Sequence, residues 1–415
     1  MSSISATEAK VVAHKWVIPR LSLMMFLQFF VWGAWYVTLG VVMAKYGLAA
    51  LIGDAYSTGP IASILSPFVL GMLVDRFFPS QKVLAVLHLV GAALLWWMPS
   101  FFATGQGGLL WIIFAYMLCY MPTIALSNNV AFHNLSSSEK GFPIARAFGT
   151  FGWIVAGLIV GVSGLSDSTG IFTLAAVASL ILGIYSFTLP NTPAPDRGKP
   201  LSLRDLFCAD AFAMLKQRHF LVFIICATLI SIPLAAYYAY AAPFISALGF
   251  ENVSGVMALG QISELLFMLL IPFCFRRLGI KIMLLIGMLA WFLRYAMFAL
   301  SINEETRWMI YLGIILHGVC YDFFFVIGFI YTDKAAGERV KGQAQSLLVL
   351  FTYGIGMLIG SQISGAVFNR SVTATGAEAL VQWQSFWWMP AIAAVLIAGL
   401  FFFTFNYKEG EKDGR

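Results

Sequence analysis

Several ionisable side chains of this sequence lie inside long apolar runs, where burying a charge costs free energy. Only two carboxyl groups, Glu264 and Asp322, lie well within such runs. Charged groups in a lipid environment are rare and mark ligand sites, proton pathways or ion pairs. These three kinds of chemistry are therefore the candidates for the whole set, which consists of Glu264, Asp322, Arg146, Arg294, His88 and His317.

Glu264 follows Gln261 by three residues, so a helix places both side chains on one face. A carboxylate beside an amide suits the hydroxyl and amide groups of a polar ligand. The alternative is a structural ion pair, in which Arg146 or Arg294 binds Glu264 and holds two helices together.

Asp322 lies in the segment that also contains His317 and Tyr321. His317 and Tyr321 are four residues apart and share a helix face, whereas Asp322 is turned by about 100° from Tyr321. Burial disfavours the charged form of a carboxyl group, which suits reversible protonation. The alternative for Asp322 is a hydrogen bond between helices. For His317 we favour a ligand contact over a proton relay or a packed imidazole.

Arg146, Thr150 and Trp153 have the spacing of a single helical stripe. A guanidinium, a hydroxyl and an indole can bind a planar polar ligand by hydrogen bonding and stacking. The alternative is that Arg146 extends to the cytoplasmic rim. Tyr238 follows Pro233 in a tyrosine-rich segment, where a ligand contact and a membrane-interface belt are both open.

The composition identifies the elements that carry these residues. Of 415 residues, 60% are apolar and 11% are charged, against about 25% charged in soluble domains. This excludes a nucleic-acid-binding module, a disordered scaffold and an ordinary cytosolic enzyme. Apolar runs of membrane-spanning length predict twelve helices, over 21–45, 50–74, 82–101, 108–133, 143–164, 170–189, 219–248, 253–275, 280–301, 307–332, 342–368 and 383–406.

The basic residues predict the orientation of these helices. If the N-terminus is cytoplasmic, most of the 25 Lys and Arg residues fall in cytoplasmic segments, and only Lys45, Arg307 and Arg370 fall outside. This is the positive-inside pattern, so both termini are expected in the cytoplasm. The net charge of +6 then needs no anionic partner, and no nucleic acid is expected.

A hydrophilic segment divides the chain into two halves. It begins with Pro190 and carries several basic residues. Each half also contains a proline-bearing run, at Pro67 and at Pro272, that ends in a basic turn. The predicted organisation is a six-helix half (1–189), a cytoplasmic linker (190–218), a second six-helix half (219–407) and a cytoplasmic tail (408–415).

Two pseudo-symmetric six-helix halves are the layout of the major facilitator superfamily, in which the halves rock around a site at the bilayer midplane. The segment Gly71-x-x-x-Asp75-Arg76 resembles that superfamily's signature loop between the second and third helices. It is therefore a candidate gating loop, with an ordinary positive-inside turn as the alternative.

Several stretches resemble the bacterial nucleoside–proton symporter family of this superfamily. They are Phe26-Leu27-Gln28-Phe29, Trp32-Gly33-Ala34-Trp35, Tyr120-Met121-Pro122-Thr123, Gly149-Thr150-Phe151-Gly152, Gln261-Ile262-Ser263-Glu264, Leu278-Gly279-Ile280-Lys281, Ala290-Trp291-Phe292-Leu293-Arg294 and Tyr321-Asp322-Phe323-Phe324. The resemblance implies an all-α transporter, driven by protons, that takes up nucleosides across the bacterial cytoplasmic (inner) membrane. We expect a monomer in the lipid bilayer, with no cofactor, no metal and no enzymatic activity.

Carried over by position, the family's binding residues fall on Arg146, Thr150, Gln261 and Glu264, which match in type. Trp153 and Tyr321 stand where aromatic residues are expected, and Asp322 matches a candidate proton-coupling carboxylate, with Glu264 as the second candidate.

This chain departs from the family at two places. Ala235 and Tyr238 stand where amides are expected, and His317 stands where a tyrosine is expected. The departures leave the nucleoside or related solute open. The alternative functions are a uniporter, or an exporter of another small polar or drug-like solute on the same fold.

Overall fold

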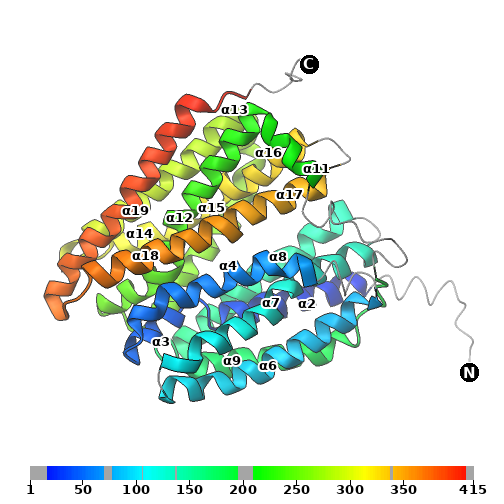
Figure 1. Ribbon diagram of the computed structural model, residues 1–415, viewed down its shortest axis with the longest axis horizontal. Coiled ribbons are helices and arrows are strands. Elements are labelled where there is room, and N and C mark those ends of the chain that lie inside the picture. Colours follow the sequence, from blue (N-terminus) through cyan, green and yellow to red (C-terminus); the bar gives the residue numbers. More distant parts are fainter. Residues whose placement is uncertain are drawn as a thin grey trace, which may run out of the picture. The chain divides into compact units, whose positions relative to one another are not determined.

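The computed structural model describes residues 16–69, 77–104, 106–135, 138–194, 209–336 and 340–407, and their regular secondary structure is helical (Figure 1). The helices are α2 (Val17–Gly33), α3 (Leu39–Lys45), α4 (Ile52–Val69), α6 (Ser80–Thr104), α7 (Gln106–Asn134), α8 (Ser138–Val162), α9 (Gly170–Ser186), α11 (Ala209–Phe212), α12 (Arg218–Ala247), α13 (Val253–Leu300), α14 (Met309–Ile315), α15 (His317–Tyr321), α16 (Ile327–Ala335), α17 (Lys341–Val349), α18 (Met357–Ser371) and α19 (Gly376–Thr404).

Many of these helices have the length and composition of membrane spans. Within the described residues, eight helical stretches are long and apolar enough to cross a bilayer, and α2 and α9 are shorter apolar helices. The longest, α13, consists of two arms because Gly279 has a φ of 68°, a left-handed conformation that glycine adopts readily. The two arms coincide with the separate runs expected over 253–275 and 280–301.

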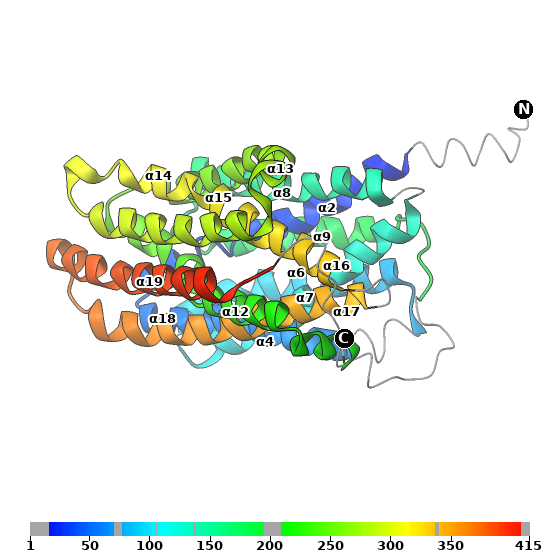
Figure 2. The ribbon, with the colours of Figure 1, turned by 90° about the horizontal axis from the view of Figure 1, so that it is seen from above.

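Three of the expected runs are interrupted helices. The run over 21–45 is divided into α2 and α3 by turns at 34–38. The run over 307–332 is built from α14, α15, a π turn η5 (Asp322–Val326) and α16, which follow one another in Figure 2. The run over 342–368 is built from α17, a second π turn η6 (Leu350–Gly356) and α18. π turns inside helices are frequent at functional sites, and the first one here begins at a candidate proton-coupling residue.

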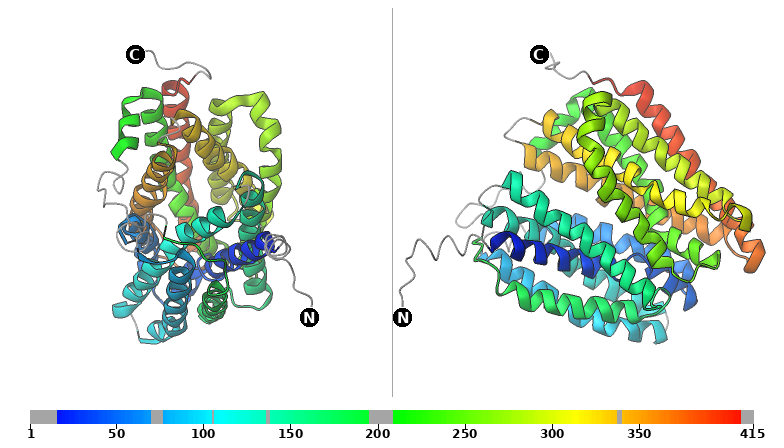
Figure 3. Two further views of the ribbon diagram at one scale, coloured as in Figure 1. Left: turned by 90° about the vertical axis from the view of Figure 1, so that its right-hand side faces the viewer. Right: turned by 180° about the vertical axis from the view of Figure 1, so that it is seen from behind.

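Contacts divide the chain into two compact units. The first contains the described residues of Met1–Tyr36 and Leu65–Leu201, and the second those of Val37–Ile64 and Ser202–Arg415. In the first unit α2 packs on α8 and α9, and α6 packs on α7 and α9 (Figure 3). In the second unit α12 packs on α18 and α19, and α13 packs on α15 and α19.

The segment 37–64 belongs by its contacts to the second unit, although it precedes the expected boundary between halves. The Gln362 side chain donates from Nε2 to Asp54 Oδ1 (2.9 Å) and to Ser57 Oγ (2.8 Å). These bonds, together with packing of α3 on α12, explain why contacts group this segment differently from the sequence halves.

Some of the sequence predictions fall outside the described residues. These are the candidate gating residues Gly71, Asp75 and Arg76, the tail 408–415 and much of the linker. The start of the linker is held by the first unit, because Asn134 Nδ2 donates to Thr192 Oγ1 (2.8 Å) and the backbone N–H of Ser80 donates to the Thr192 carbonyl (2.9 Å).

Candidate functional site

In the second unit, a close approach of two helices brings the key polar residues together. The backbone N–H of Gly318 in α15 donates to Ser263 Oγ in α13 at 2.9 Å. A Cβ atom on Gly318 would lie 2.6 Å from the backbone carbonyl of Ser263, a distance that real Cβ atoms do not adopt. Only glycine allows this contact, and it places His317 beside Glu264.

We expect Gly318→Ala to lower the melting temperature of the purified protein, because the added methyl group must push α13 and α15 apart. Overpacking of this kind costs about 1–3 kcal/mol. Gly399→Ala is the matched control, since a Cβ there meets no atom within 4 Å. Thermal unfolding in detergent would show the difference, and equal melting temperatures for the two variants would contradict the close-packing argument.

His317 joins a buried acid to a buried base. Its Nε2 lies 3.7 Å from Glu264 Oε2, and its Nδ1 lies 2.7 Å from Arg294 Nη2. The side chain of Glu264 is 12% exposed and that of His317 is 2% exposed, while Arg294 is fully buried. Arg294 and Glu264 therefore face the two different nitrogens of one imidazole ring.

Aromatic rings support this arrangement. The Arg294 guanidinium carbon lies 4.0 Å from the centre of the Tyr237 ring, in cation–π geometry. Tyr237 also stacks on His317 with ring centres 5.4 Å apart, and Tyr238 contacts Tyr237 edge-on at 5.6 Å. Tyr238 thus stands next to the cluster, half-buried on α12.

The sequence did not reveal the roles of Tyr237 and Arg294. The arginine was visible as a basic residue in an apolar run, but its partner was not, because Arg294 and His317 are 23 residues apart and lie on different helices.

Tyr321 and Asp322 mark the point where α15 passes into the π turn. The His317 and Tyr321 rings lie 5.6 Å apart, which confirms that they share a face. Asp322 is fully buried, and among the described residues neither of its carboxyl oxygens has a hydrogen-bond partner. A buried polar group without partners is costly, so this carboxyl group is suited to exchanging a proton. Gln261 lies one turn before Glu264 on α13 and is half-buried.

In the first unit, α8 presents the expected stripe toward aromatic residues of α2. The guanidinium carbon of Arg146 lies 4.1 Å from the centre of the Phe29 ring. Trp153 and Trp32 pack at 5.4 Å with an angle of 66° between their rings. Thr150, between them on the stripe, is buried. The structure thus places Arg146 and Trp153 against aromatic rings of α2, with Thr150 buried between them on the same helix.

A buried polar network lies within the same unit. His88 Nε2 is 2.8 Å from Gln28 Oε1 and its Nδ1 is 3.0 Å from Ser179 Oγ. Gln28 Nε2 donates to Thr123 Oγ1 at 2.7 Å. The network joins α2, α6, α7 and α9, and its groups are buried and hydrogen-bonded to one another, so it acts as a structural connection between helices.

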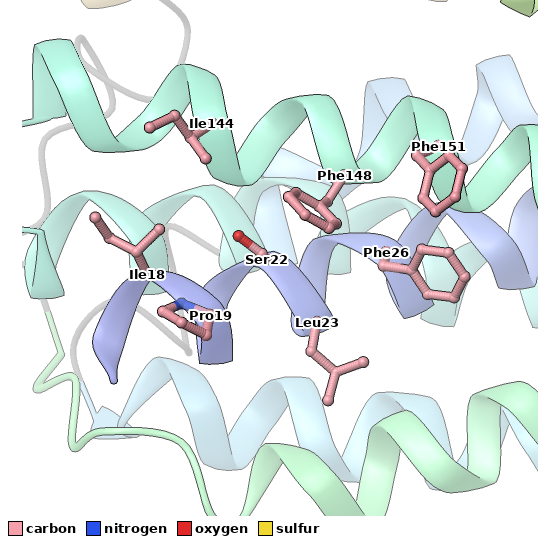
Figure 4. Close-up of a pocket in the computed structure, with 8 residues that line it drawn as sticks. All are labelled: Ile18, Pro19, Ser22, Leu23, Phe26, Ile144, Phe148 and Phe151. Atoms are coloured by element: carbon pink, nitrogen blue, oxygen red, sulfur yellow. The ribbon is translucent and has the colours of Figure 1, made fainter. Parts of the chain in front are cut away.

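A surface groove of about 480 Å³ lies between α2 and α8 (Figure 4). Its lining is apolar apart from one hydroxyl and includes none of the candidate site residues. Such a surface suits the acyl chain of a lipid and not a polar solute. The groove is formed by Ile18, Pro19, Ser22, Leu23, Phe26, Ile144, Phe148 and Phe151.

The chain matches known transporters over most of its length. It is 39% identical over 404 residues to the putative nucleoside transporter YegT of Escherichia coli, covering 94% of both chains. It is 31% identical over 408 residues to the xanthosine permease of the same organism, covering 94% of this chain and 96% of the relative. Two crystal structures of the nucleoside transporter NupG have TM-scores of 0.86 and 0.83. Each is 29% identical and matches 94% of this chain and 100% of the other.

These relatives are transporters and not enzymes. The family model described as nucleoside H+ symporter matches residues 17–410, a range that includes both polar clusters described above. The chain therefore belongs to the nucleoside H+ symporter family.

Proposed function

We propose that this protein couples nucleoside uptake to proton entry by alternating access. The observation that carries the proposal is the polar cluster of the second unit, in which Glu264 and His317 lie together and Asp322 is buried without a hydrogen-bond partner among the described residues. Family membership makes a nucleoside the expected solute and a proton the expected coupling ion.

In this mechanism the ribose is bound by hydrogen bonds from the second unit. Glu264 accepts from ribose hydroxyl groups, and Gln261 can both donate and accept. Tyr321 and Tyr238 offer ring faces for the base.

In the first unit, the stripe of Arg146, Thr150 and Trp153 offers a guanidinium, a hydroxyl and an indole for binding a planar polar solute. An Arg146 that packs on Phe29 keeps its guanidinium edges available for hydrogen bonds.

Asp322 is the proposed proton-binding group. Glu264 and Asp322 repel each other when both are ionised, so a proton on Asp322 allows Glu264 to keep its charge for the ligand. A proton entering down a potential of 100 mV supplies about 2.3 kcal/mol, equivalent to about fifty-fold accumulation of the solute.

The wider architecture is part of the proposal. We infer twelve spans in two six-helix halves, 1–189 and 219–407, with both termini in the cytoplasm and a loop containing Gly71, Asp75 and Arg76 that controls reorientation. The protein acts as a monomer in the bacterial inner membrane, with protons as the coupling ion and no cofactor. The eight long apolar helical stretches within the described residues support the membrane-spanning part of this proposal.

A transport screen in liposomes tests the function. Purified wild-type protein is supplied with radiolabelled nucleosides and nucleobases, with and without an external acidic pH gradient. We expect at least one nucleoside to accumulate above its external concentration only when the gradient is imposed. Equal equilibration with and without the gradient would favour a uniporter. Expulsion of a loaded cationic dye, without nucleoside transport, would favour an exporter of drug-like solutes.

A further inference from the structure

The geometry points to Arg294 as a positioning residue that fixes His317 as a neutral hydrogen-bond donor from Nε2, so that Glu264 and His317 together bind one sugar hydroxyl. This inference rests on the proposed nucleoside transport and assigns a role to a residue outside the ligand-contacting set.

The bond between Arg294 and His317 determines the tautomer of the imidazole. A guanidinium has only N–H donors, so at 2.7 Å from Arg294 Nη2 the Nδ1 atom of His317 must accept. In a neutral imidazole the other nitrogen then carries the proton. The same bond excludes the imidazolium form, because a protonated Nδ1 would face another donor.

The free-energy cost of burying Arg294 indicates that this residue is kept to fix the tautomer of His317. Arg294 is fully buried, and within the described residues its Nε and Nη1 atoms have no hydrogen-bond partner. Its contacts include the bond to His317 and the face of the Tyr237 ring, and Tyr295 and Cys320 also interact with it. A buried cation with so few hydrogen bonds is an expensive structural element, whereas a fixed donor beside a binding carboxylate is a functional reason to keep it.

The Nε2–H group that this tautomer of His317 provides faces Glu264. Nε2 and the carboxylate Oε2 are 3.7 Å apart, beyond the range of a direct hydrogen bond. A hydroxyl oxygen can lie about 2.8 Å from both atoms, accepting from His317 and donating to Glu264. A hydroxyl group has both functions, whereas a hydrogen atom at the same carbon has neither. The pair therefore selects for a hydroxylated sugar position and against a deoxy position.

Transport specificity provides the first test. Adenosine, uridine and guanosine are compared with their 2′-deoxy and 3′-deoxy analogues by kcat/KM for uptake into liposomes. We expect wild type to prefer the ribonucleoside over one of the two analogues, and Arg294→Met to reduce that preference about fivefold. Arg294→Lys, which keeps one donor and the charge, is expected to retain most of it.

A double-mutant comparison separates positioning from a merely structural role. A glutamine amide can offer an N–H group without having to choose a tautomer, so in the His317→Gln background Arg294→Met is expected to change the preference less than about twofold. Equal losses for ribonucleosides and deoxynucleosides in both backgrounds would overturn the positioning role. Absence of any nucleoside uptake by wild type would instead overturn the proposed function.

The second test uses wild-type protein and does not depend on folding of a variant. The chain has five histidines, and ¹⁵N labelling of their rings, with His317→Gln for assignment, reports which nitrogen carries the proton. We expect a neutral His317 protonated at Nε2 in the absence of solute. A ring protonated at Nδ1, alone or together with Nε2, would overturn the inference whether or not nucleosides are transported.

Discussion

Asp322→Asn should abolish proton-driven accumulation of nucleosides while leaving measurable exchange of labelled for unlabelled solute across the membrane. Asparagine keeps the size of the buried side chain but cannot take up or release a proton. A coupled proton driven by a 100 mV potential can sustain a roughly fifty-fold ratio of internal to external solute. Without the coupled proton this ratio falls to one. The measurements are uptake into liposomes under an imposed pH gradient and counterflow without one.

Asp333→Asn is the matched control for this prediction. Asp333 lies on α16 beyond the π turn, where its carboxylate is half-exposed and paired with Lys341 at 3.3 Å, so accumulation should be retained. Full pH-driven accumulation by Asp322→Asn would show that this residue does not carry the proton, and Glu264 would become the principal candidate.

Glu264→Gln should weaken nucleoside binding by about ten- to a hundredfold. The carboxylate accepts hydrogen bonds as a charged group, and such bonds contribute about 1.5–3 kcal/mol. Glutamine retains the shape and one acceptor oxygen but loses the charge, and its amide also adds a donor next to His317. Equilibrium binding of a radiolabelled nucleoside to purified protein measures the loss directly.

Glu251→Gln controls for the loss of one negative charge from the same unit, because Glu251 is exposed near the start of α13. Its binding constant should match that of wild type. If Glu264→Gln binds as tightly as Glu251→Gln, the carboxylate does not contact the solute, and its place beside His317 is structural.

The positions of the helices could largely be predicted from the apolar runs of the sequence. The runs expected over 143–164 and 170–189 correspond to α8 and α9, because twenty apolar residues between polar segments leave little choice except a helix in a bilayer. The break at Gly279 was also foreseeable as the turn between two runs. The π turn at Asp322 was not, because the sequence around it is continuous and apolar.

Much of the candidate site could also be located from residue types. Glu264, Asp322 and Arg146 were conspicuous because charges are costly in apolar runs, and the spacing of His317 and Tyr321 correctly predicted their shared face. Spacing alone left two partners of Glu264 open, Arg146 and Arg294. It could not choose between them because it defines faces within one helix and not contacts between helices.

By itself, then, the sequence determined which residues are out of place in a membrane and which helices carry them. Only the tertiary structure decided that Arg294 binds Nδ1 of His317 and that Nε2 of the same ring faces Glu264. The physical reason is the close approach at Gly318. A contact between helix backbones depends on how two distant segments pack, and this packing sets which nitrogen of the imidazole carries its proton.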